Sequence, residues 1–415
     1  MATNIFKLEV LRARHGDCLL LHYGTKTKPG LALIDGGPPK VYKPFLRPRL
    51  EELRAERGLD EADPLMIDLM MLSHIDEDHV AGLLELTKEL IAAKTTQFVQ
   101  VLDLWHNSFD DIVGDDAQEL GRAVNQQFGP ASLSGDLSLE SLADLVDSGS
   151  AKTAVDSLMV LASIPQGRDL RSNAEKLKIP LNAEADGELI VATDEKSPVD
   201  MGKGLTFTVV GPMEPELKAL QADFAKFAKR PKEDRETASV LASFAADGSV
   251  TNLSSIVALA QMKDKTILFT GDALGDKVLE GLEMAGVIEE GGSLHVDVLK
   301  GPHHGSDRNV TTEFLQRITA DHYVFSADGD FGNPDRETLE MLAEARGTDD
   351  YQIHLTYPID EIDAARKKFR DSKGTLPKWS KAKHSLAAFL GDNRDVNDKV
   401  VIVEEGVPHI IELLG

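Results

Sequence analysis

The stretch MLSHIDEDHVAG, residues 71–82, decides how the rest of this sequence is interpreted. It places two histidines and three acidic residues within six positions, directly after a run of apolar residues. Asp76 or Asp78 alone would be explained as the N-cap of a following helix. Five ionisable side chains together need a common function, and imidazole with carboxylate is a ligand combination that proteins offer to divalent metal ions.

Composition is that of a folded protein without a membrane span. The chain has 415 residues, of which 42% are hydrophobic and 28% charged, enough for one large domain with additions or for two domains. There is no apolar run of about 18 residues, and the first residues lack the features of a signal peptide. A single cysteine, Cys18, excludes an internal disulfide, so we expect a cytoplasmic location.

The charge balance is strongly acidic, with 70 acidic against 45 basic residues and a net charge of −25. Such a chain repels nucleic acid unless basic residues gather locally. They gather in residues 43–58 and in residues 366–385, where Trp379 offers a surface on which a base could stack. Solvated helix faces are the simpler explanation for both stretches.

Periodicity in the first part of the chain predicts strands interrupted by one helix. The apolar run at 65–74 is typical of a strand buried on both faces, and residues 80–93 have helical spacing. Strand, helix, strand is the unit of a layered α/β fold. The predicted strands are residues 5–13, 18–24, 31–37, 65–74 and 97–106.

The remainder begins with a helical stretch and then returns to alternating strands and helices. Residues 110–185 resemble helices joined by Gly, Ser and Pro, and we interpret them as an insertion. Residues 254–273 predict two strands around a turn at 263–265, and residues 399–413 predict a hairpin that turns at Glu405-Gly406. Helices are predicted at 216–230 and 275–286, and a strand that runs into a polar loop at 294–306.

Three polar clusters each follow a strand-like run: residues 74–79, Asp272 in ILFTGDA, and the His pair in VLKGPHHGS. Taken singly, they would be a helix cap, a turn and a solvent-exposed loop. Because functional groups gather where the strands of an α/β sheet end, their conjunction predicts a metal site. The candidate ligands are His74, Asp76, Asp78, His79, Asp272, His303 and His304.

These motifs resemble a known family. SHIDEDHVAGL is similar to the His-x-His-x-Asp-His signature of the metallo-β-lactamase fold, in the variant in which Asp replaces the second His. Together with LFTGD and LKGPHHGS, it resembles the metallo-β-lactamase domain of ComEC-type DNA-uptake proteins and the related phosphorylcholine esterases. RHGDCLLLHYG and LALIDGG match the opening strands of that group. The resemblance covers roughly residues 5–105 and 205–345.

The resemblance implies an αββα sandwich, in which two sheets are faced by helices and metals lie at one edge between the sheets. Residues 1–108 would form the first half of this fold, and residues 109–200 a mainly helical insertion. Residues 201–348 would form the second half. Residues 349–415 would be a short C-terminal extension with the basic stretch and a terminal hairpin.

The resemblance also implies a role for each candidate ligand. His74 and Asp76 would bind one metal, and Asp78 and His79 the other. Asp272 would bridge the two ions, and the His303-His304 pair would complete both sets. Asp35 in LIDGG would be a carboxylate that orients a ligand histidine. The expected cofactors are two divalent ions, Zn²⁺ by preference, with Mn²⁺ as the alternative.

Two departures from the family pattern concern the site. Many members carry another histidine between the first motif and the Gly-Asp motif, where this chain has only His106. His106 could reach the site, or it could be a capping or surface residue. Asn333 stands where the ComEC group often has histidine before a proline, and its amide could bind substrate but is a poor zinc ligand.

The function expected from this pattern is a metal-dependent hydrolase. A metal-bridged hydroxide would attack a phosphodiester in a nucleotide or short nucleic acid, with Asp78 orienting the nucleophile. The alternatives are an ester or lactone hydrolase on the same metals, and a degenerate module that only binds or scaffolds. The insertion would cover the pocket or bind a protein partner.

Overall fold

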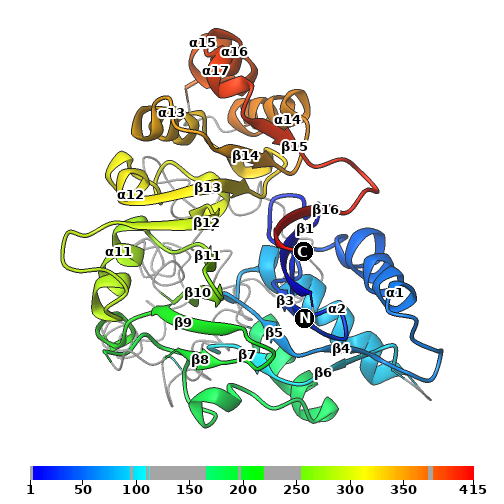
Figure 1. Ribbon diagram of the computed structural model, residues 1–415. Helices are drawn as coiled ribbons and strands as arrows, with labels where there is room; N and C mark the ends of the chain where they lie inside the picture. The colour runs from blue at the N-terminus through cyan, green and yellow to red at the C-terminus, as the bar shows by residue number, and fades with distance from the viewer. Residues whose placement is uncertain are drawn as a thin grey trace, which may run out of the picture.

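The computed structural model describes residues 3–93, 97–108, 112, 165–194, 198–218, 254–372 and 377–415 (Figure 1). In these ranges the chain is mixed α/β, with one sheet of six strands, one of eight and a third of two. Within the same ranges no helix has the length and apolar character that crossing a membrane requires.

The six-stranded sheet has the order β16-β1-β2-β3-β5-β7. The pairs β16·β1, β1·β2 and β2·β3 are antiparallel, and β3, β5 and β7 run parallel. Its strands are β1 (Asn4–Val10), β2 (Leu19–Thr25), β3 (Lys28–Ile34), β5 (Leu69–Met71), β7 (Leu104–Trp105) and β16 (His409–Leu414). A separate parallel pair consists of β4 (Leu65–Ile67) and β6 (Val99–Val101).

The eight-stranded sheet has the order β15-β14-β13-β12-β11-β10-β9-β8. Strands β11 to β15 are parallel, and β8 to β11 are antiparallel. Its strands are β8 (Val199–Asp200), β9 (Thr206–Gly211), β10 (Val257–Met262), β11 (Lys265–Phe269), β12 (Leu294–Lys300), β13 (Ile318–Phe325), β14 (Gln352–Leu355) and β15 (Val400–Ile402).

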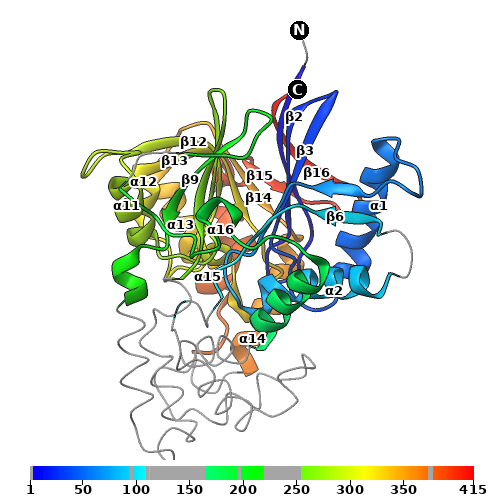
Figure 2. The ribbon, with the colours of Figure 1, turned by 90° about the horizontal axis from the view of Figure 1, so that it is seen from below.

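The two large sheets pack face to face, with helices on both outer sides (Figure 2). Alternation along β2 shows how: Leu19 and Leu21 join the core between the sheets, whereas Leu20 joins the core under the helices. The six-stranded sheet is covered by α1 (Arg47–Glu56) and α2 (Glu77–Ala92). The eight-stranded sheet is covered by α11 (Gly275–Met284), α12 (Thr312–Arg317), α13 (Arg336–Arg346), α14 (Ile359–Ser372) and α16 (Leu386–Asp392).

Several local predictions are confirmed. The first three predicted strands are β1, β2 and β3, and the helix expected at 80–93 is α2, which begins three residues earlier. The turn at 263–265 joins β10 to β11. The helix expected at 275–286 is α11, and the strand expected at 294 onward is β12.

The single strand expected at 65–74 is wrong, because the chain changes sheet at Asp68. Strand β4 pairs with β6, whereas β5 lies between β3 and β7. The Asp68 carboxylate accepts hydrogen bonds from the Leu31 backbone nitrogen at 3.1 Å and from the Tyr23 hydroxyl at 2.8 Å. The strand expected at 97–106 divides in the same way into β6 and β7.

The terminal hairpin is also wrong. Strand β15 pairs parallel with β14, whereas β16 pairs antiparallel with β1 in the other sheet. Arg12 holds the connection by donating to the Val403 carbonyl at 2.9 Å. Residues 349–415 therefore complete both sheets, since β15 covers the edge that β14 offers and β16 covers the edge that β1 offers.

The helical insertion lies partly outside the described residues, as does most of the helix expected at 216–230. Residues 165–177 are helical, and Leu170 and Ala174 pack into the core that contains α2. Two further short helices are α15 (Lys381–His384) and α17 (Arg394–Asn397).

Candidate metal centre

The predicted ligands follow strands whose carboxyl ends meet at one edge of the molecule. His74 follows β5, Asp272 follows β11, and the His303-His304 pair follows β12. Because β3 and β5 are parallel, and β11 and β12 are parallel, the loops after each pair leave from the same sheet edge. The Ile256 backbone nitrogen donates to the Ser73 carbonyl at 2.8 Å and ties the two sheets together there.

The start of α2 shows why a capping role does not explain the acidic residues. Asp76 has the extended backbone of an N-cap, but its side chain makes no capping hydrogen bond. Its carboxylate lies 3.5 Å from His74 Nε2 instead. The helix thus positions the carboxylate without using it.

The His303-His304 pair lies in a strained turn. Both residues have left-handed backbone, with φ of 45° and 55°. Residues with a Cβ rarely adopt this conformation, which costs about 1–3 kcal/mol each and is concentrated at functional sites. The turn is held by hydrogen bonds from the His303 nitrogen to the Gly271 carbonyl at 3.1 Å and from Asn333 Nδ2 to the His303 carbonyl at 3.2 Å.

Asp272 lies at the centre of the predicted ligands. Its Oδ2 is 3.5 Å from His74 Nε2 and 3.5 Å from His303 Nε2. Its Oδ1 is 3.5 Å from His79 Nε2 and 3.5 Å from His304 Nε2. One carboxylate therefore separates a first donor set (His74, Asp76, His303) from a second donor set (Asp78, His79, His304).

The second donor set is tightly grouped. His79 Nε2 and His304 Nε2 are 3.3 Å apart. Asp78 Oδ2 lies 3.4 Å from His304 Nε2, and Asp78 Oδ1 lies 3.8 Å from His79 Nε2. The side chains of Asp76, Asp78 and His303 are 18%, 17% and 22% exposed, whereas those of the other four ligands are 3% exposed or less. The first three therefore mark the side from which a substrate would enter.

Asp35 holds two of the imidazoles from behind. Its Oδ2 lies 2.9 Å from His79 Nδ1 and accepts the Ser73 hydroxyl at 2.7 Å, while its Oδ1 accepts the Ser73 backbone N–H. Ser73 Oγ in turn lies 3.0 Å from His74 Nδ1. These contacts favour a proton on Nδ1 of each ring, facing Asp35 from His79 and the Ser73 hydroxyl from His74, and leave both Nε2 atoms for a metal.

Sequence reasoning missed Asp17 and Lys300. Both are 1% exposed and form an ion pair, and Asp17 Oδ1 lies 3.5 Å from His304 Nδ1. The signal was present as Gly16-Asp17, a Gly-Asp pair beside a strand like Gly271-Asp272. The partner of Asp17 could not be found in the same way, because Lys300 belongs to the buried end of β12.

His15 was missed as well. It lies near Asp78, but burial dominates and lowers the pKa of His15 to about 4, so that its ring is neutral at pH 7. His15 also groups with Asp328 and Asp330. Arg14 lies 3.9 Å and 3.5 Å from these two carboxylates and compensates their charge.

Charges inside the site depend strongly on one another. Burial and His79 disfavour the charged form of His74, yet Asp272 and Asp76 outweigh them and raise its pKa to about 9. Burial likewise opposes the charge of His304, yet Asp272 and Asp17 raise its pKa to about 9. Burial would raise the pKa of Asp78, but His79 and His304 hold it below its usual range. Cations and protons therefore compete for these nitrogens.

The donor set fits a pair of divalent ions. Most donor separations, 3.3–3.5 Å, exceed those of good hydrogen bonds. They match the spacing of about 3.4 Å expected between ligands of a tetrahedral ion with bonds of about 2.1 Å. His74 Nε2, Asp76 Oδ1 and Asp272 Oδ1 are buried and lack a hydrogen-bond partner in the described part of the chain. Cations would satisfy these atoms.

The two residues at which the sequence departs from the family pattern are not among the grouped donors. His106 is buried beside Gly167, and its backbone exchanges hydrogen bonds with the Asn182 side chain. Asn333 is 6% exposed and supports the His303 turn from behind.

The basic stretch around Trp379 is partly used in packing. The Trp379 ring lies 5.6 Å from the His384 ring and 5.9 Å from the Arg366 guanidinium. Arg366 is buried and donates to the Gly332 carbonyl at 2.9 Å, which joins α14 to the loop before Asn333. Nucleic-acid binding by this stretch stays a prediction.

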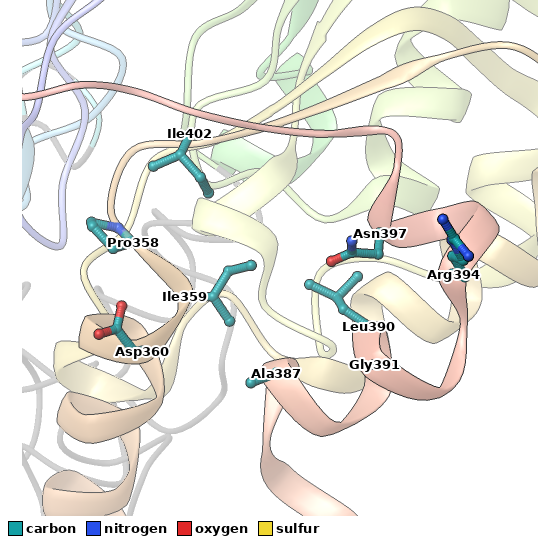
Figure 3. A pocket seen from close by; sticks show the side chains of 9 residues that line it. All are labelled: Pro358, Ile359, Asp360, Ala387, Leu390, Gly391, Arg394, Asn397 and Ile402. Atoms are coloured by element: carbon teal, nitrogen blue, oxygen red, sulfur yellow. The ribbon is translucent and has the colours of Figure 1, made fainter.

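A separate cavity of about 510 Å³ opens near the far edge of the eight-stranded sheet (Figure 3). Its lining is apolar at Ile359, Leu390 and Ile402 and polar at Asp360 and Arg394. It contains no histidine and no predicted ligand. The candidate chemistry thus belongs to the donor cluster and not to this cavity.

Comparison with known proteins does not assign this chain to a family. The sequence matches no model of a known protein family, and no curated protein matches it.

Proposed function

We propose that this protein is a metal-dependent hydrolase of the metallo-β-lactamase fold and that it cleaves phosphodiesters. The observation that carries the proposal is the position of Asp272, each of whose oxygens faces two imidazoles. The order of layers, helix, sheet, sheet and helix, supports the fold, as does the location of the donors at one edge between the sheets.

Two divalent ions bound there would supply a hydroxide nucleophile at neutral pH and neutralise charge on the reacting group. Asp78 is suited to accept a hydrogen bond from the attacking water, because its side chain lies between the buried imidazoles and solvent. Asp272 keeps the two donor sets at a fixed separation.

The ligand chemistry supports a phosphodiester over a neutral ester. Three of the seven donors, Asp76, Asp78 and Asp272, are carboxylates, which suit hard cations. Two divalent ions held close together would neutralise charge on the oxygens of a phosphodiester. Surrounding acidic residues would disfavour a long polyanion, which leaves a nucleotide or a short strand as the expected substrate.

The test combines elemental analysis with hydrolysis of bis(p-nitrophenyl) phosphate. We expect two metal equivalents per chain, and a fall in kcat/KM of about 100-fold or more in Asp78→Ala and in Asp272→Asn. Asp272→Asn should lose both ions, whereas Asp76→Asn should lose one. Asp321→Asn, at a half-exposed site in β13, is the control and should change neither quantity.

Three outcomes would contradict the proposal. Normal turnover by Asp78→Ala would refute the assigned role of that carboxylate. Hydrolysis of p-nitrophenyl acetate but not of the phosphodiester would favour an ester or lactone hydrolase. A chain that takes up no metal would favour a binding or scaffold module.

A further inference from the structure

We infer that Asp17 and Lys300 are positioning residues that control one of the two metal positions, the one formed by the second donor set. The inference rests on the metal centre of the proposed function. It concerns how His304 is held, and not how a substrate reacts.

Asp17 reaches His304 from the loop between β1 and β2. Its Oδ1 lies 3.5 Å from His304 Nδ1, on the side of the ring opposite to the donor cluster. The loop is pressed against the start of α2, since a Cβ added at Gly16 would lie 1.9 Å from the Asp78 carbonyl oxygen. Asp17 is therefore fixed in place by packing and by its own contacts.

Lys300 keeps that carboxylate charged in a buried position. Its ammonium forms an ion pair with Asp17, donates to the Gly271 carbonyl at 3.2 Å and lies 4.0 Å from Asp272 Oδ1. Both partners are 1% exposed, so each charge would be costly to bury without the other. The negative charge of Asp17, 3.5 Å from His304 Nδ1, favours a proton on that nitrogen and leaves Nε2 as a ligand atom.

The contrast with Asp35 makes the inference specific. Asp35 contacts His79 directly and His74 through Ser73, so it serves imidazoles of both donor sets. Asp17 contacts His304 at 3.5 Å and lies farther from His79, at 3.9 Å. Removing the Asp35 carboxylate should therefore weaken the binding of both ions, and removing the Asp17 carboxylate should weaken the binding of one.

The test is a titration of the metal-free protein with Zn²⁺ in competition with a chromophoric chelator, which gives two dissociation constants. We expect Asp17→Asn to raise the dissociation constant of one ion by about 10- to 100-fold. The dissociation constant of the other ion should change by less than about 3-fold. Asp35→Asn should raise both dissociation constants.

Two further variants test the role of the lysine. Because Lys300→Met alone leaves a buried unpaired carboxylate, the neutral pair Asp17→Asn/Lys300→Met should fold and show the same one-ion loss. Lys300→Arg keeps a cation beside Asp17, so it should bind that ion more tightly than Lys300→Met does.

Double-mutant cycles separate positioning from general damage. In a His304→Ala background, Asp17→Asn should cause no further loss of metal affinity. In a His303→Ala background, the loss of affinity caused by Asp17→Asn should add to that caused by His303→Ala. Lys203→Met is the matched control, because it breaks a remote ion pair with Asp68 at 2.7 Å and should leave both constants unchanged.

Equal weakening of both ions by Asp17→Asn, or a full further loss in the His304→Ala background, would overturn the inference. These readouts do not involve turnover. A chain that shows the one-ion loss but cleaves no phosphodiester would refute the proposed substrate alone, and a chain that binds no metal would refute both.

Discussion

Gly16 occupies a point at which no side chain fits. A Cβ there would lie 1.9 Å from the Asp78 carbonyl oxygen and 2.8 Å from the Pro38 ring. Asp78 lies in the first turn of α2 and Pro38 in the loop after Asp35, so the absence of a side chain at Gly16 lets the β1–β2 loop, the Asp35 loop and the start of α2 meet at the candidate metal centre. The positions of Asp17 and Asp78 depend on this contact.

Gly16→Ala should move Asp78 and destabilise the protein by about 1–3 kcal/mol, because backbone cannot give way as a flexible side chain would. We expect weaker binding of the ion held by the second donor set, measured by chelator competition, together with a lower free energy of unfolding in urea. Gly391→Ala is the control, since nothing lies within 4 Å of a Cβ at that position. Unchanged metal binding in Gly16→Ala would contradict this packing argument.

Among the elements, the short strands β4 and β5 show how one polar residue divides an apolar run. Asp68 separates them and accepts from Leu31 and Tyr23, while Lys203 pairs with the same carboxylate. The sequence pattern of an unbroken strand is overridden because a carboxylate can accept several hydrogen bonds at the point where the chain leaves one sheet for another.

Asp68→Ala should lower the free energy of unfolding by about 2–3 kcal/mol, because it leaves the buried Leu31 N–H and the Tyr23 hydroxyl without an acceptor. Lys203→Met removes only the partly exposed cation and should cost less than about 1 kcal/mol. Urea denaturation of both variants measures the difference. Equal costs would mean that the ion pair, and not the two hydrogen bonds, matters.

At the scale of the whole molecule, three histidines in a line connect the two large sheets. His322 Nδ1 lies 3.0 Å from His354 Nε2, and His354 Nδ1 lies 2.9 Å from His409 Nε2. His322 and His354 belong to the eight-stranded sheet and His409 to β16 of the other. Burial, with His409 and His322 adding to it, lowers the pKa of His354 to about 3.

This lowered pKa predicts a loss of stability in mild acid. Below the unfolded value of about 6.5 the unfolded chain binds a proton that folded His354 does not bind until about pH 3. The contribution of neutral His354 to the free energy of unfolding is therefore fully present above about pH 6.5. It is lost as the pH falls below that value, by up to about 1.4 kcal/mol per pH unit. His354→Asn should flatten the pH dependence of the unfolding free energy between pH 7 and 5, measured with a chelator present.

The exposed His295 provides the comparison, since its side chain is 54% exposed. His295→Asn should leave the pH dependence as in the parent protein. If His354→Asn also left it unchanged, the line of histidines would not be the source of the acid sensitivity.

Metal removal should act on the whole fold, because the donor cluster joins loops from both sheets. An ion that binds only the folded chain stabilises it by about 4 kcal/mol at 1,000 times its Kd. We expect a chelator to lower the melting temperature by several degrees in calorimetry. Asp272→Asn, which should bind neither ion, should show no such shift.

Sequence patterns predicted which residues group at one sheet edge, the Asp35 carboxylate behind them, and the positions of α2, β11 and β12. These features are local, since periodicity, turn residues and the sequence of a loop are set by neighbours along the chain. The seven predicted ligands lie together in the structure, and the His106 backbone is held by the Asn182 side chain.

The sheet that each short strand joins, and the buried charges that face one another, depend on contacts between distant parts of the chain. Strands β15 and β16 are close in sequence but lie in different sheets, and Lys300 meets Asp17 from 283 positions away. The physical reason is that strand pairing and ion pairing depend on which edge or charge remains unsatisfied after the chain collapses, and this is not written in the pattern of any single segment.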